Sequence, residues 1–221
     1  MDKTFDVFNM ALKLAPLFLG YKQQSQPSTI LTEKDLALIN LRNKDGAVIV
    51  VLGTRDTGKT ELCYRLAEFL GKPTYAVSPE QKPHPDWIKR IDIENLDEMV
   101  MPHSTVILDD VPIYLSSKDY GEALNRALEK IIPMVRHERK WHMIFSSQNS
   151  AQADRYILDC DAAFLKPLGL LMGAVERPNI ARIYKMMVDP EFDGKDDHYI
   201  QRHAFFLSRT FRGIIKVKKV D

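Results

Sequence analysis

Residues 53–60 contain the residue types that bind the phosphates of a nucleotide. They are Gly-Thr-Arg-Asp-Thr-Gly-Lys-Thr, which matches the G-x-x-x-x-G-K-T pattern of a phosphate-binding loop. Lys59 is predicted to reach the β- and γ-phosphates, and Thr60 to coordinate Mg²⁺. A glycine-containing turn before a surface helix would explain the glycines but not the Lys-Thr pair. We therefore predict that a nucleoside triphosphate contacts Gly53, Thr54, Arg55, Asp56, Thr57, Gly58, Lys59, Thr60 and Glu61.

A pair of carboxylates follows an apolar run about fifty residues later. Residues 105–110 are Thr-Val-Ile-Leu-Asp-Asp, the pattern of a buried strand that brings acids to the carboxyl edge of a sheet. Asp109 is predicted to hold Mg²⁺, directly or through water, and Asp110 to act as the general base on the attacking water. Adjacent acids favour hydrolysis over transfer to a small acceptor. Asp110 as a turn residue before Val111-Pro112 is the alternative.

Gln148 ends a third apolar run, at 142–147. In the predicted topology the tip of this strand lies between the two nucleotide motifs. The Gln148 amide is then placed to sense the γ-phosphate or to orient water.

Basic residues precede that strand in the segment Arg136-His137-Glu138-Arg139-Lys140. Arg136 is predicted to be an arginine finger, a cation that a subunit donates to its neighbour's nucleotide, with Arg139 as the alternative. Cations that stabilise the end of a helix, or that contact DNA phosphates, are the other interpretations of this segment.

Alternating strands and helices must position these side chains. Apolar runs predict strands at 47–52, 74–78, 104–108, 142–147 and 161–166, and helices at 59–70, about 120–136 and about 177–188. This order implies an α/β fold with a mostly parallel sheet covered by helices on both faces. Two final strands, at 204–208 and 213–220, are expected to extend the edge of the sheet.

The first 45 residues differ from the rest of the chain. They are predicted to form a helical extension and linker, with an amphipathic helix at 4–19 and a short helix that begins at 32–35 and reaches Leu41. The ATPase-type domain is then 46–221. The apolar segment 5–19 is interrupted and too short to span a bilayer, so no transmembrane span is expected. The histidines lack zinc-ligand spacing, and no zinc is expected.

Composition limits the classes of function. The 221 residues are enough for one large-cored α/β domain. The formal net charge of +1 gives no overall basic signal for nucleic acid, so any contact with DNA must be local.

These motifs, in this order, resemble the FtsK–HerA superfamily of P-loop motors. The resemblance depends on residues 53–60, 105–110 and 143–148 and on the Arg136-His137 pair, and it covers about 45–220. Within that superfamily the chain is similar to the genome-packaging ATPases of tailless, membrane-containing viruses and to zonula-occludens-toxin-like assembly ATPases of filamentous phages. Asp110 departs from the family pattern, which commonly has Glu there. The shorter side chain must lie closer to the water or act through a second one.

The resemblance implies a RecA-like (ASCE) P-loop NTPase, a three-layer sandwich that hydrolyses ATP with Mg²⁺ and moves double-stranded DNA into a preformed capsid. It also implies a ring of identical subunits, a hexamer, that contacts capsid or portal-vertex proteins. Such a protein works in the cytoplasm of the infected cell or at the packaging vertex of the virion.

Two other functions remain open. One is a phage assembly or secretion ATPase, whose relatives usually carry a membrane span. The other, of a different class, is a nucleotide or metabolite kinase, in which Asp110 and Gln148 have no natural role.

Overall fold

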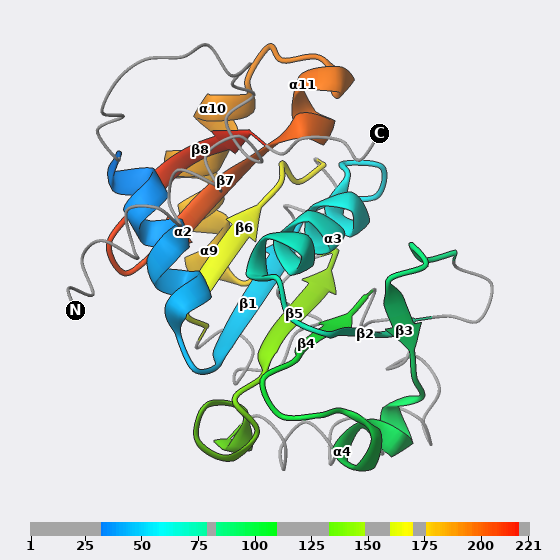
Figure 1. Cartoon of the computed structure of the whole chain (residues 1–221). Coiled ribbons are helices and arrows are strands. Elements are labelled where there is room, and N and C mark those ends of the chain that lie inside the picture. Colours follow the sequence, from blue (N-terminus) through cyan, green and yellow to red (C-terminus); the bar gives the residue numbers. More distant parts are fainter. Residues whose placement is uncertain (1–31, 79–82, 110–132, 149–159, 170–175, 217–221) are drawn as a thin grey trace, which may run out of the picture.

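The computed structural model describes residues 32–78, 83–109, 133–148, 160–169 and 176–216 (Figure 1). No helix within these ranges is long and apolar enough to cross a membrane. The helices are α2 (Glu33–Asn43), α3 (Lys59–Leu70), α4 (Leu96–Met99), α9 (Pro178–Ile183), α10 (Asp189–Phe192) and α11 (Asp197–Arg202), together with the helical turns η1 (Ile93–Asn95), η2 (Val135–Arg139) and η4 (Tyr184–Val188).

In this part of the chain, one sheet has the strand order β3-β2-β4-β5-β1-β6-β7-β8. Neighbouring strands from β3 to β6 are parallel, whereas β7 and β8 are antiparallel to their neighbours. The predictions of a mostly parallel sheet and of a C-terminal strand pair at its edge are thereby confirmed. The strands are β1 (Ala47–Leu52), β2 (Thr74–Val77), β3 (Ile88–Arg90), β4 (Thr105–Leu108), β5 (His142–Ser147), β6 (Ala162–Leu165), β7 (His203–Ser208) and β8 (Arg212–Lys216).

The central strand β1 is buried along its whole length because helices cover both faces of the sheet. Alternate β1 side chains enter two separate hydrophobic clusters. One cluster contains Ile49 together with residues of α2 and α3, and the other contains Val50 together with residues of η4 and α10. The arrangement is a three-layer α/β fold, as the sequence predicted (Figure 1).

Helix α2 begins with a capping box. The Thr32 hydroxyl accepts a hydrogen bond from the Asp35 amide at 3.3 Å, and the Asp35 carboxylate accepts one from the Thr32 amide at 3.0 Å. The helix predicted here is confirmed. Its buried face packs into the same cluster as α3 through Ala37, Leu38 and Leu41.

Several sequence-based expectations fall outside the described residues. These are the helix at 4–19 and most of the helix at about 120–136. The boundary at residue 45 stays a prediction. The sequence did not predict the edge strand β3 or the short helices α4, α10 and α11, because a few residues carry little periodic signal.

The antiparallel strand β7 is joined to the parallel part of the sheet by an aromatic pair. Phe164 of β6 and Phe206 of β7 are cross-strand partners, fully buried, with ring centroids 4.7 Å apart and 8° between the planes. Phe206→Leu is expected to lower the free energy of unfolding by about 1–2 kcal/mol, since it removes the stacking and leaves a small void. Urea unfolding measures the change. Trp87→Leu, at an exposed position, is the control, and an equal loss in both variants would contradict this view of the pair.

His142, at the start of β5, is buried with no exposed surface. Its Nε2 lies 3.0 Å from the Leu41 carbonyl, which can only accept, and its Nδ1 lies 2.9 Å from the Lys72 ammonium, which can only donate. The ring is therefore neutral, with its proton on Nε2. Burial, opposed by the hydrogen bond to Leu41 and assisted by the charge of Lys72, lowers the pKa of His142 to about 4.

Because His142 is neutral in the folded protein, we expect the free energy of unfolding to depend on pH. Between the ordinary pKa of 6.5 and the folded value of about 4, the unfolded chain binds more protons than the folded one. The free energy of unfolding should therefore fall, by on the order of 2 kcal/mol, as the pH drops through that window. Urea unfolding at several pH values measures the slope. His142→Gln should flatten it, and the exposed His198→Gln should not. Equal slopes in the wild type and His142→Gln would contradict the assignment.

Candidate nucleotide site

The loop of residues 53–58 connects the end of β1 to the start of α3, as the motif requires. Gly58 is in the left-handed region, with φ at 82°, and caps the N-terminus of α3. Glycine is also required by space. A Cβ on Gly53 would lie 2.4 Å from the Lys166 Cβ, and one on Gly58 would lie 2.8 Å from the Gln201 carbonyl oxygen. The loop is thus held between α3 and two segments from the C-terminal half of the chain.

Lys59 lies within the curve of this loop. Its ammonium donates a hydrogen bond to the Thr54 carbonyl at 2.7 Å, and only 8% of the residue is exposed. The Thr57 hydroxyl donates to the same carbonyl at 2.8 Å. The loop therefore folds around its own lysine, and the N-terminal end of α3 adds a positive potential at the same place.

Asp109 follows β4 and meets the first turn of α3. The Thr60 hydroxyl donates to Asp109 Oδ2 at 3.1 Å, although the two residues are 49 positions apart. Asp109 is 1% exposed. A threonine hydroxyl and a carboxylate are hard oxygen ligands, the kind that Mg²⁺ takes together with substrate phosphates. The donor set fits the predicted metal, and the predicted meeting of these two side chains is observed.

A hydrogen-bonded chain borders Asp109. The Tyr64 hydroxyl, on α3, lies 2.8 Å from His84 Nδ1 and 3.4 Å from the Pro83 carbonyl, and the Ser78 hydroxyl contacts His84 Nε2. Burial, and then the charge of Asp109, raise the pKa of Tyr64, so the phenol remains protonated. This chain ties the segment after β2 to α3 beside the site. No motif in the sequence indicated it.

Gln148 lies where the strand order predicted. Strand β5 is between β4 and β1 in the sheet, and the Gly53 amide donates to the Ser147 carbonyl at 3.3 Å. The half-buried Gln148 is the next residue, at the same edge as the loop and Asp109. Asp110 lies outside the described residues, so its role as general base stays a prediction.

The two arginines proposed as fingers belong to η2, directly before β5. The side chain of Arg136 lies outside what the structure describes. Arg139 is engaged within the same chain, where its guanidinium contacts the Asp97 carboxylate and lies 5.5 Å from the centre of the Trp141 ring. These contacts pack η2 against the region of α4.

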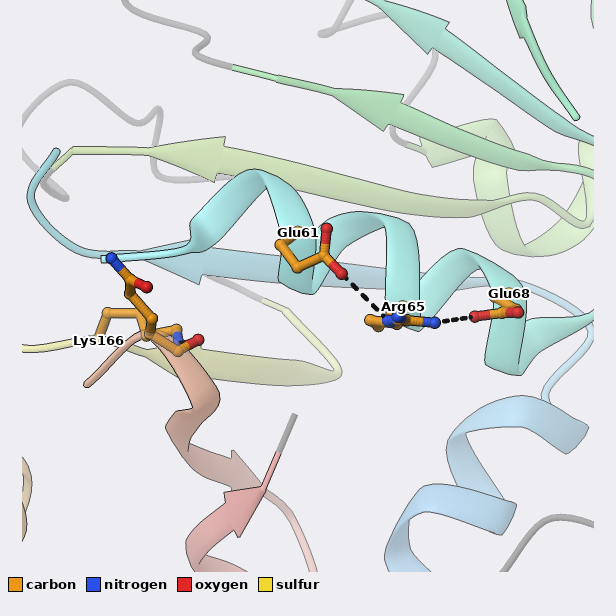
Figure 2. Close-up of polar contacts among 5 residues, drawn as sticks. Glu61, Arg65, Glu68 and Lys166 are labelled. Atoms are coloured by element: carbon orange, nitrogen blue, oxygen red, sulfur yellow. Dashed lines mark hydrogen bonds and ion pairs between the residues drawn. The ribbon is translucent and has the colours of Figure 1, made fainter. Parts of the chain in front are cut away.

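Glu61 is paired along the surface of α3. Figure 2 shows its carboxylate directed at Arg65, which also reaches Glu68; the two distances are 3.2 and 2.8 Å. Arg55 and Asp56 are exposed at the tip of the loop. Of the predicted contact residues, Thr57 and Lys59 donate to the Thr54 carbonyl within the loop, and Thr60 donates to Asp109. Glu61 instead pairs with Arg65 of the same helix.

Lys166 is a residue of this region that the sequence did not indicate. It directly follows β6, is fully buried, and donates to the Ile200 and Gln201 carbonyls at 2.9 and 3.0 Å. Burial and the nearby charge of Lys59 lower its pKa to about 7. A lysine at the carboxyl end of an apolar strand is the one available signal, since ligands bind at that edge of a parallel sheet.

A glycine loop between a parallel strand and a helix, with a buried aspartate at the helix's first turn, defines the P-loop NTPase fold. Known structures of this class have the same architecture. The genome-packaging NTPase B204 of Sulfolobus turreted icosahedral virus 2, solved with ATP-γS, matches with a TM-score of 0.52 and 14% identity over 80% of this chain and 99% of that one. ATPases 2 and 3 of the protein EccC from Thermomonospora curvata match with a TM-score of 0.52 and 10% identity over 82% of this chain and 38% of that one.

These similarities confirm the fold that the sequence predicted, including its likeness to a viral packaging ATPase. No protein-family model matches the chain, and no curated protein matches its sequence.

Proposed function

We propose that this protein is a Mg²⁺-dependent ATPase that moves double-stranded DNA during viral genome packaging. The observation that carries the proposal is the contact between Thr60 and Asp109 beside the folded phosphate loop. It brings the phosphate-binding and metal-binding motifs to one point, which hydrolysis of a nucleoside triphosphate requires. The match to a packaging NTPase along nearly the whole of that chain supports the choice of biological role.

Each residue of the site has a distinct task in this proposal. The loop amides and Lys59 bind the β- and γ-phosphates, while Thr60 and Asp109 hold Mg²⁺, which neutralises the charge that develops on the phosphates. Gln148 orients the water or senses the γ-phosphate. Asp110 takes the proton from that water. Arg136 is proposed to enter the site of the neighbouring subunit, which makes a ring of identical subunits, a hexamer, the active form.

Measurement of ATP hydrolysis with and without duplex DNA, together with particle mass by light scattering, tests this function. A DNA-moving ring should release phosphate faster when duplex DNA is present, and its mass should be several times that of one chain. A monomer whose hydrolysis ignores DNA at every salt concentration would refute the motor. Transfer of phosphate to a small acceptor would instead identify a kinase.

The second candidate is an assembly or secretion ATPase, which threads a polypeptide or a virion rather than DNA. One observation favours it: the fold matches EccC, whose cytoplasmic domain is described as that of a type VII secretion ATPase, with the same TM-score as the packaging enzyme. The two candidates share all the site chemistry. Stimulation by duplex DNA, rather than by a peptide of a secreted or capsid protein, separates them.

The proposed partners follow from the packaging role. They are double-stranded DNA, further copies of the chain, and capsid or portal-vertex proteins. The proposed place of action is the cytoplasm of the infected cell or the packaging vertex. A pull-down with assembled capsids, in the presence and absence of ATP, tests the capsid contact directly.

A further inference from the structure

The last residues of α11, 200–202, lead directly into β7. This segment, the α11–β7 junction, covers the phosphate-binding loop. A Cβ added to Gly58 would lie only 2.8 Å from the Gln201 carbonyl oxygen, so the two backbones are in close contact. The Gln201 side-chain amide also lies 3.5 Å from the Asp56 carbonyl. Two points of contact, both with the last residues of the loop, place this junction directly against the segment that surrounds phosphate.

Lys166 holds the junction in this position. Its ammonium ends between the Ile200 and Gln201 carbonyls, and the residue is fully buried. A buried ammonium is costly to desolvate, and two backbone carbonyls compensate only part of that cost. The lowered pKa agrees with this environment. A neutral amine keeps two N–H groups, so the bridge to the two carbonyls survives loss of the proton.

The same lysine also contacts the first residue of the loop. Its Cβ occupies the space that a side chain on Gly53 would need, and its amide donates to the Leu52 carbonyl at 2.7 Å. Figure 2 shows Lys166 beside the turn that enters α3. Lys166 therefore touches the beginning of the loop with its stem and positions, through its ammonium, the backbone that covers the end of the loop.

We infer that Lys166 is a positioning residue of the nucleotide site: it holds the α11–β7 junction as one wall of the phosphate-binding loop, so that phosphate binding also immobilises this junction. The inference rests on the proposed nucleotide site but not on DNA movement or packaging. Because β7 begins at His203, directly after the junction, occupancy of the loop is coupled mechanically to the C-terminal edge of the sheet.

The first test compares the steady-state kinetics of Lys166→Met with those of the wild type. Methionine retains an unbranched apolar stem but no donor. The KM for ATP should rise about tenfold while kcat changes less than about threefold, since the wall is lost and the reacting groups remain. Lys89→Met, on the exposed edge strand β3, is the matched control and should leave KM unchanged. A variant with lower thermal stability but wild-type KM would assign Lys166 a structural role alone and overturn the inference.

The second test uses the wild-type protein and does not depend on how the variant folds. Amide hydrogen exchange is measured over residues 197–208 with and without ATP-γS and Mg²⁺. Protection of the amides at 199–203 on nucleotide binding is the expected result. Nucleotide binding without a change there would overturn the inference and leave the ATPase proposal intact. Protection of these amides in a protein that does not hydrolyse ATP would support the inference and refute the ATPase proposal.

Discussion

Lys59→Ala is expected to lower kcat/KM for ATP hydrolysis by about 10³-fold or more. The Lys59 ammonium is held within the loop by the Thr54 carbonyl, where it is ready to move onto phosphate oxygens. In a water-poor site, such a fixed cation strongly stabilises the negative charge that develops on the transferring phosphoryl group. Release of inorganic phosphate at saturating Mg²⁺ measures the loss.

Lys89→Ala is the control for this variant, because Lys89 is exposed on an edge strand at the opposite end of the sheet order from β7 and β8. It should retain the wild-type rate. Far-ultraviolet circular dichroism checks that Lys59→Ala is folded. Hydrolysis at an undiminished rate by a folded Lys59→Ala protein would remove the loop from the catalytic site and, with it, the proposed function.

Asp109→Asn is expected to lower turnover about 10²-fold and to raise the Mg²⁺ concentration needed for half-maximal rate. Asparagine has nearly the same shape and can still accept a hydrogen bond from Thr60, so the local packing at this buried position is preserved. What is lost is the negative charge, on which binding of a hard divalent cation depends. The measurement is a Mg²⁺ titration of phosphate release at fixed ATP.

The matched control is Asp193→Asn at an exposed position, which should show the wild-type Mg²⁺ dependence. The two substitutions are chemically the same, so any difference reports the position. If Asp109→Asn lowered the rate but left the Mg²⁺ dependence unchanged, Asp109 would act by positioning Thr60 and not as a metal ligand.

The sequence by itself determined the local parts of this protein. Residues 53–60 specify a loop between a strand and a helix because the glycines permit its backbone and the flanking apolar runs have the periods of those two elements. Strand–helix alternation then specifies a parallel sheet, and parallel strands end at a common edge. For that reason the meeting of Thr60 with Asp109 and the place of Gln148 could be predicted.

Only the tertiary structure decided which distant segments cover the site. Lys166 directly follows a short apolar strand, and residues 200–201 belong to the last turn of a short helix before a strand, so neither segment has a local pattern that points to the phosphate loop. They meet there because β6 pairs with β1 and β7 pairs with β6. The tertiary structure also decided the partners of Arg139, which contacts the Asp97 carboxylate and the Trp141 ring. Local sequence patterns determine the backbone conformation of an element and the face that it buries. Contacts between backbone groups and single polar side chains depend instead on strand order and register. Strand order and register are determined by the packing of the whole core.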